Sequence, residues 1–320
     1  MQIICRRGGE MKKKIVGVIL ILGIIFSFSG CVNKSNENDG EKLRVGVTIN
    51  PLKDFTEAIG GDKVEVFSII PDGSDAHSFD PKPKDLKDLI NTNMFVYNGL
   101  GMEEWIDSVL NTVEGKDIKI VEASNGIKPI SISEEDHEHE EGDEDHGHEH
   151  SGNDPHMWLS LSDATKQAEN IKNSLVEMNP ENKDYYESNY EKLKQDFANL
   201  QNEYESKFQE ITNKDFVTGH AAFAYLCRDF GLTQKSIADV FGEGELTPKN
   251  LETLINYCKE NNVKVIFSES TASAKESETL AREVGAKVEK IYSLETKEDD
   301  KSYLEGMKYN LETIYNSLKN

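Results

Sequence analysis

Basic residues are scarce in this chain of 320 residues: 36 Lys and Arg stand against 59 Asp and Glu, and the formal net charge is −23 at pH 7. An acidic surface of this kind repels nucleic acid and anionic substrates and attracts cations. A simpler interpretation is that most of these charges only keep an exported protein soluble. Under either interpretation no nucleic-acid partner is expected.

Cysteine is also scarce. Of four cysteines, Cys5 and Cys31 belong to the first 31 residues, which leaves Cys227 and Cys258, each inside a segment with a helical pattern. Two cysteines about thirty residues apart do not make the disulfide framework of a small secreted domain. They could pair outside the cell or remain two buried thiols, and the sequence leaves both possibilities open.

The apolar run near the start is too short to span a bilayer. After Met11 and three lysines it extends over about fifteen residues, whereas a spanning helix needs about 20. Small residues follow, so residues 1–30 are predicted to be a secretory signal peptide. Residues 1–10 fit no targeting pattern and suggest a start codon assigned too early.

A lipid anchor is predicted at the end of this signal. Phe28-Ser29-Gly30-Cys31 resembles the lipobox of bacterial lipoproteins, in which the cysteine is acylated and becomes the new N-terminus. Cys31 would then hold the mature protein at the outer face of the cell membrane, with residues 31–42 as a polar tether. A plain secretory signal is the alternative.

From residue 43 onward, apolar runs rich in β-branched residues alternate with helical patterns. Such alternation predicts parallel sheets covered by helices on both faces, that is, the α/β fold class. The first lobe is expected at 43–180 and the second at 213–320. Strands are expected at 44–48, 63–70, 94–97, 118–121, 215–218, 234–240, 263–268 and 287–292, with helices near 51–60, 82–91 and 102–113.

Between the lobes, residues 181–212 contain no Gly or Pro. Apolar residues recur at spacings of three and four, which predicts one helix of roughly 30 residues, about 45 Å long. Such a rigid connector, packed along both lobes, would restrain hinge closure. A coiled-coil dimer is the alternative use of the same stripe, and a monomer is expected. The stripe consists of Tyr186, Tyr190, Leu193, Phe197, Leu200, Tyr204, Phe208 and Ile211.

Three of the eight histidines stand in contexts that suit a binding site. His77 follows the strand expected to end at Ile70, and His220 lies where a strand gives way to a helix. The carboxyl ends of parallel strands form the crevice in which open α/β sheets bind ligands. His156 precedes the apolar Met157 ahead of another helix. A single histidine in such a place is more often a loop or cap residue than a ligand, but three across both lobes are harder to dismiss as ligands of one site in the cleft between them.

Residues 134–150 have a different character. They hold ten acidic residues, five histidines and two glycines, with no Lys or Arg, a composition that cannot bury enough apolar surface to fold. The segment 134–151 is therefore predicted to be a disordered loop. Its histidines are expected to make weak, multiple contacts with metal ions, although a tolerated insertion without a role is the alternative. They are His137, His139, His146, His148 and His150.

Several motifs together resemble a known family. They are GSDAHSFDP, FVYNGLGMEEW, DPHMWLS, TGHAAFAYL and VIFSEST. The chain from Leu43 to its end is similar to the substrate-binding lipoproteins of metal-ion ABC transporters, those of the zinc and manganese importers. The resemblance implies that the histidines of the first, third and fourth motifs bind the metal, which are His77, His156 and His220. Ala76 departs from the family, which often has proline there.

The fourth ligand indicates the subtype. Manganese-type relatives tend to place an aspartate at a position that aligns with Leu294, which cannot bind a cation. Zinc-type relatives use a glutamate in the equivalent loop, so the resemblance favours Glu295, with Glu269 of VIFSEST as the rival. Both glutamates could instead be surface or capping groups.

Zinc is therefore the predicted ligand, carried rather than used in catalysis. Three neutral imidazoles and one carboxylate suit tetrahedral Zn²⁺, whereas Mn²⁺ prefers more oxygen. No HExxH motif and no Ser or Cys nucleophile motif is present, so an enzyme such as a zinc hydrolase is disfavoured. The resemblance implies delivery of Zn²⁺ to an ABC permease and its ATPase. A manganese or iron carrier of the same fold, or a surface adhesin or metal-buffering lipoprotein, is the alternative.

Overall fold

The computed structural model describes residues 42–132, 152–243, 246–270 and 272–319. The predicted signal peptide, Cys31 and the histidines of 134–150 lie outside the described residues. Within the described ranges, no helix is both long enough and apolar enough to cross a membrane.

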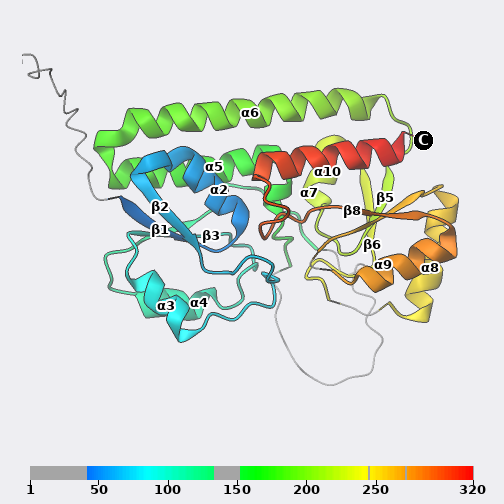
Figure 1. The fold of residues 1–320 in the computed structure, drawn as a ribbon, viewed down its shortest axis with the longest axis horizontal. Coiled ribbons are helices and arrows are strands. Elements are labelled where there is room, and N and C mark those ends of the chain that lie inside the picture. Colours follow the sequence, from blue (N-terminus) through cyan, green and yellow to red (C-terminus); the bar gives the residue numbers. More distant parts are fainter. Residues whose placement is uncertain (1–41, 133–151, 244–245, 271, 320) are drawn as a thin grey trace, which may run out of the picture. The chain divides into compact units, whose positions relative to one another are not determined.

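The first lobe is built on a four-stranded parallel sheet (Figure 1). In the order β2-β1-β3-β4, Val45 lies opposite Val66 and Met94. Helices α2 and α5 cover one face of this sheet, and α3 and α4 cover the other. The elements are β1 (Leu43–Val47), α2 (Asn50–Gly60), β2 (Val64–Ser68), α3 (Pro83–Ile90), β3 (Met94–Tyr97), α4 (Ile106–Val113), β4 (Lys119–Glu122) and α5 (Leu161–Met178).

The second lobe repeats this strand order. Its parallel sheet runs β6-β5-β7-β8, with Val217 opposite Ile266. Helices α7 and α10 cover one face, and α8 and α9 cover the other. The elements are β5 (Asp215–Thr218), α7 (Ala224–Phe230), β6 (Thr233–Ser236), α8 (Pro248–Glu260), β7 (Val265–Ser268), α9 (Ala274–Val284), β8 (Lys287–Lys290) and α10 (Tyr303–Leu318). The predicted α/β class with two parallel sheets is confirmed.

One long helix joins the lobes, as the sequence predicts. Helix α6 (Lys183–Gln209) follows a short 3-10 helix, Pro180–Asn182, and packs against α2 and α5 of the first lobe and α7 and α10 of the second (Figure 1). Six residues of its apolar stripe are buried in the protein's own core, and Leu193 and Ile211 pack against it. The stripe is therefore used within the chain and not for a coiled coil.

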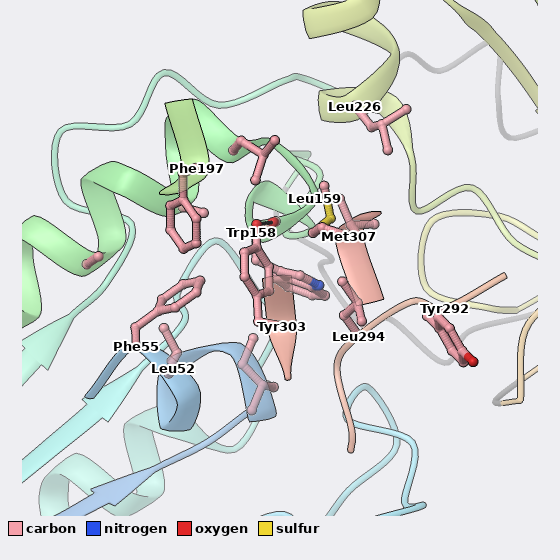
Figure 2. Packing of buried hydrophobic residues seen from close by; sticks show 14 of the residues in the cluster. Leu52, Phe55, Trp158, Leu159, Phe197, Leu226, Tyr292, Leu294, Tyr303 and Met307 are labelled. Carbon is pink, nitrogen blue, oxygen red and sulfur yellow. Dashed lines mark hydrogen bonds between the residues drawn. The ribbon is translucent and has the colours of Figure 1, made fainter. Parts of the chain in front are cut away.

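A shared core fills the region between the lobes. Phe55 of α2, Phe197 of α6 and Tyr303 of α10 contact one another edge to face, with ring centroids 4.7 to 5.6 Å apart. Figure 2 shows Trp158 between this group and the side chains of Leu294 and Met307. This continuous core, which contains residues of both lobes, restrains their relative motion because separating them would expose buried aromatic surface.

Two element boundaries lie furthest from the sequence-based prediction. The strand expected at 234–240 ends at Ser236, after which the chain continues as a loop held by backbone bonds from Ile237 and Ala238. The helix expected at 102–113 begins only at Ile106. There, Leu100 and Gly101 have positive φ, and the Glu103 carboxylate accepts the N–H groups of the preceding turn. At the start of α4, the Glu103 side chain therefore accepts backbone hydrogen bonds where the prediction had a helical turn.

The two cysteines of the second lobe are free thiols. Cys227 on α7 and Cys258 on α8 are both buried, and they belong to clusters on opposite faces of the second sheet. The sheet between them prevents a disulfide. Of the two possibilities that the sequence leaves open, the structure shows the buried thiols.

Candidate metal centre

Three histidines and one glutamate from distant parts of the chain meet between the lobes. His77 lies in the loop from β2 to α3, and His156 directly precedes the 3-10 helix η4 (Met157–Leu159). His220 follows β5, and Glu295 follows β8. One ligand atom of each side chain lies within 4.8 Å of the others. The structure thus brings together all four residues that the sequence analysis favours.

Three of the polar atoms that converge there lack hydrogen bonds. Nε2 of His220 and both carboxylate oxygens of Glu295 are buried and have no partner among the described residues. Nε2 of His77 lies 3.1 Å from Nε2 of His156, within hydrogen-bond distance, and the His77 ring can donate to His156 from this nitrogen. Buried polar groups normally find a partner because an unpaired one is costly. A cation held by all four side chains would satisfy these atoms together.

His156 is held with Nε2 toward this point. Its Nδ1 atom and its backbone N–H both lie 2.8 Å from Oδ1 of Asp154. The ring therefore donates from Nδ1 and leaves the Nε2 lone pair free, the arrangement in which a carboxylate orients a metal-binding imidazole. Burial lowers the pKa of His156 well below its usual range and raises the pKa of Asp154 to about 7.

His220 is oriented in the same way by Glu269. Oε1 of Glu269 lies 3.4 Å from Nδ1 of His220, and Oε2 accepts the N–H of Gly219 at 2.9 Å. A Cβ at Gly219 would collide with Oε2, so only glycine permits this approach. β5 and β7 are neighbours at the switch point of the second sheet, which places both side chains at the crevice. Glu269 thus faces the ring nitrogen opposite the cluster.

His220 differs from the other two histidines in its protonation. Burial opposes its charge, but the hydrogen bond and charge of Glu269, together with the charge of Glu295, raise the pKa of His220 to about 9. Burial lowers the pKa of His77. Two imidazoles are therefore neutral at pH 7, while the third is protonated when no cation is present.

His77 forms the open side of the cluster. It is the one half-buried member, and its backbone N–H donates to Asp75. The ring contacts Phe241 of the second lobe edge to face at 5.7 Å. A cavity of about 100 Å³ opens here and is lined by residues that include Asp75, His77, Phe241, Glu276 and Glu295. The cluster is thus reachable from one side, past acidic residues.

Sequence reasoning missed the residues that position the cluster. Asp154 stands two residues before His156 within DPHMWLS, a signal that was available. Asn98 of FVYNGLGMEEW donates to the carbonyl of Pro155, and Gln167 of α5 donates to Asn98. These three are buried beneath the His156 segment. These residues contact the His156 segment only because distant loops meet in the folded chain. Local sequence patterns do not predict such long-range contacts.

Comparisons with known proteins agree with this site. Residues 45–317 match the family model described as zinc-uptake complex component A, periplasmic. The chain is 38% identical over 317 residues to the high-affinity zinc uptake system protein ZnuA of Bacillus subtilis, covering 96% of this chain and 99% of that protein.

Two solved structures share the fold. A deletion mutant of ZnuA with zinc bound is 30% identical, with a TM-score of 0.74, over 87% of this chain and 98% of that chain. The metal-dependent lipoprotein YcdH of Bacillus subtilis is 35% identical, with a TM-score of 0.72, over 87% of this chain and 99% of that chain.

Proposed function

Because the chain belongs to the zinc-uptake complex component A (ZnuA) family, we propose that it captures Zn²⁺ in the cleft between its lobes and delivers it to a membrane importer. The observation that carries this proposal is the convergence of three imidazoles and one carboxylate with buried, unpartnered atoms. His77, His156, His220 and Glu295 would each supply one ligand. This set is the nitrogen-rich, four-coordinate one that Zn²⁺ favours.

The same site argues for carriage over catalysis. A catalytic zinc keeps one coordination position for water or substrate, whereas here four protein side chains converge on one point. The family is a class of solute-binding proteins for zinc transport and not a class of enzymes. Zn²⁺ is therefore the cargo of this protein.

Members of this family are extracytoplasmic and work with an ABC permease and its ATPase, which supports the same location and partners for this protein. We further propose a lipid on Cys31 after removal of residues 1–30, with the tether 31–42 leading to a monomeric mature protein. The relative YcdH is named a lipoprotein, which supports this anchor.

We also propose bounds for the parts of the mature protein. The lobes would correspond to 43–180 and 213–320, with 181–212 as the connecting helix. The five histidines of 134–150 would be auxiliary weak zinc contacts.

Selectivity tests the choice of metal. We expect Zn²⁺ to outcompete Mn²⁺ by more than tenfold, about 1.4 kcal/mol, because three of the four ligands are nitrogen. Equilibrium competition with a chromophoric chelator, on metal-free protein, measures both affinities. Equal occupancy at matched free concentrations would instead favour the manganese or iron carrier.

The two glutamates can be separated by substitution. Glu295→Gln is expected to weaken zinc binding at least tenfold, because it removes the charged oxygen ligand. Glu269→Gln keeps an oxygen acceptor near Gly219 and His220, so a smaller loss is expected. Titration calorimetry of both variants against the wild type measures the difference. A larger loss in Glu269→Gln would make Glu269 the ligand.

A further inference from the structure

Trp158 connects the two segments that carry His156 and Glu295. Its indole Nε1–H donates to the carbonyl of Ser293 at 2.8 Å, across 135 residues of sequence. Its own carbonyl accepts the hydroxyl of Tyr303 at 2.6 Å, and its ring lies 5.1 Å from the ring of His156. Trp158 is fully buried between these elements (Figure 2). One side chain therefore spans from the histidine of the first lobe to the loop of the second.

The loop that Trp158 holds has a backbone conformation with positive φ at Leu294. Leu294, between Ser293 and Glu295, has φ of 64°, a conformation that residues other than Gly, Asn and Asp rarely adopt. Its side chain is buried against Gly306 of α10, where any Cβ would collide with Cδ2 of Leu294. On the far side, the N–H of Asn50 donates to the carbonyl of Glu295 at 2.8 Å. Such a conformation persists only when its surroundings enforce it.

From these contacts we propose that Trp158 is a positioning residue for the metal site. This inference rests on the zinc site proposed above. By holding the carbonyl of Ser293, the indole keeps Leu294 in its left-handed conformation and thereby aims the Glu295 carboxylate at the three histidines. Because the same residue packs on His156, it sets the separation between the carboxylate and the imidazole.

A role in the hydrophobic core alone predicts something different. Loss of core packing would lower stability, but the folded protein would still present the same ligands to the ion. Loss of the indole hydrogen bond would release the Ser293 carbonyl, let Leu294 relax to negative φ and turn Glu295 away. The coordination of the bound ion then distinguishes the two roles.

The test is Trp158→Phe in the full chain, loaded with Zn²⁺ for affinity and with Co²⁺ for visible absorption. Phenylalanine keeps an aromatic ring but has no donor. We expect zinc affinity to fall at least tenfold, as for other groups that orient metal ligands. The visible bands of Co²⁺, intense in a four-coordinate site, should weaken as water replaces Glu295. A wild-type spectrum would overturn the proposal, whatever the affinity.

Trp105→Phe is the matched control. Trp105 is the other tryptophan of the chain, and its buried Nε1 has no hydrogen-bond partner among the described residues. Its replacement should change neither the affinity nor the spectrum. If the wild-type protein binds no zinc, the proposed function is wrong. If the wild type binds zinc and Trp158→Phe has the same Co²⁺ spectrum, only the role of Trp158 is wrong.

Gly306→Ala provides a second route that leaves Trp158 intact. The new methyl group would push against Leu294 from the opposite side, and alanine is otherwise favoured in a helix such as α10. We expect the same weakening of zinc binding and of the Co²⁺ bands. If Trp158→Phe does not fold, this variant decides, and wild-type binding and spectrum in Gly306→Ala would overturn the proposal.

Discussion

Replacing His156 by alanine is expected to weaken tight zinc binding by at least about a thousandfold, roughly 4 kcal/mol. His156 is fully buried, and Asp154 holds its ring with Nε2 toward the cluster, so no other side chain among the described residues is placed to replace it. The variant would also leave the Asp154 carboxylate without its ring donor. Titration calorimetry at pH 7 on metal-free protein measures the loss.

Deletion of residues 134–150 is the matched comparison. It removes five histidines where the first variant removes one, yet we expect one tight zinc per chain to remain. Only weaker binding beyond one equivalent should disappear, because a low-complexity segment must lose conformational entropy for each contact. If the deletion abolished the tight site and His156→Ala kept it, the ligand assignment would be wrong.

Zinc affinity is expected to rise about tenfold per pH unit between pH 6 and pH 8, about a hundredfold in all, with release of about one proton per ion. Without metal, His220 is protonated throughout this range because its pKa is raised to about 9. Zinc must displace the Nε2 proton, while Glu269 retains the proton on Nδ1. Affinity therefore increases with pH up to about 9 and falls as the solution becomes more acidic.

This dependence differs from the one that the sequence suggests. Three histidines with ordinary pKa values near 6.5 would make affinity fall steeply only below pH 7. In the structure, burial lowers the pKa of His77 and His156, so they stay neutral to lower pH. Calorimetry in buffers of different ionisation enthalpy counts the released protons. Release of none at pH 7, or of three near pH 6, would contradict this account.

From the sequence alone we predicted the class of the fold and the four side chains that the structure brings together. Alternating strand and helix patterns predicted two parallel sheets, because side-chain periodicity follows directly from backbone geometry. The absence of Gly and Pro over 181–212 predicted α6 to within three residues at each end. Expected strand ends indicated His77 and His220, and the motifs shared with the family indicated His77, His156 and His220.

The orientation and the partners of these side chains follow from the tertiary structure. Glu269 and Glu295 both follow strands of the second lobe, but the pairing of β5 with β7 puts Glu269 on Nδ1 of His220 and leaves Glu295 to face the histidines. Trp158 and Ser293 meet across 135 residues of sequence. Local pattern encodes which element a residue belongs to and toward which face it points. Orientation of an imidazole, and the charge it carries, depends on groups that only long-range packing brings within a few ångströms.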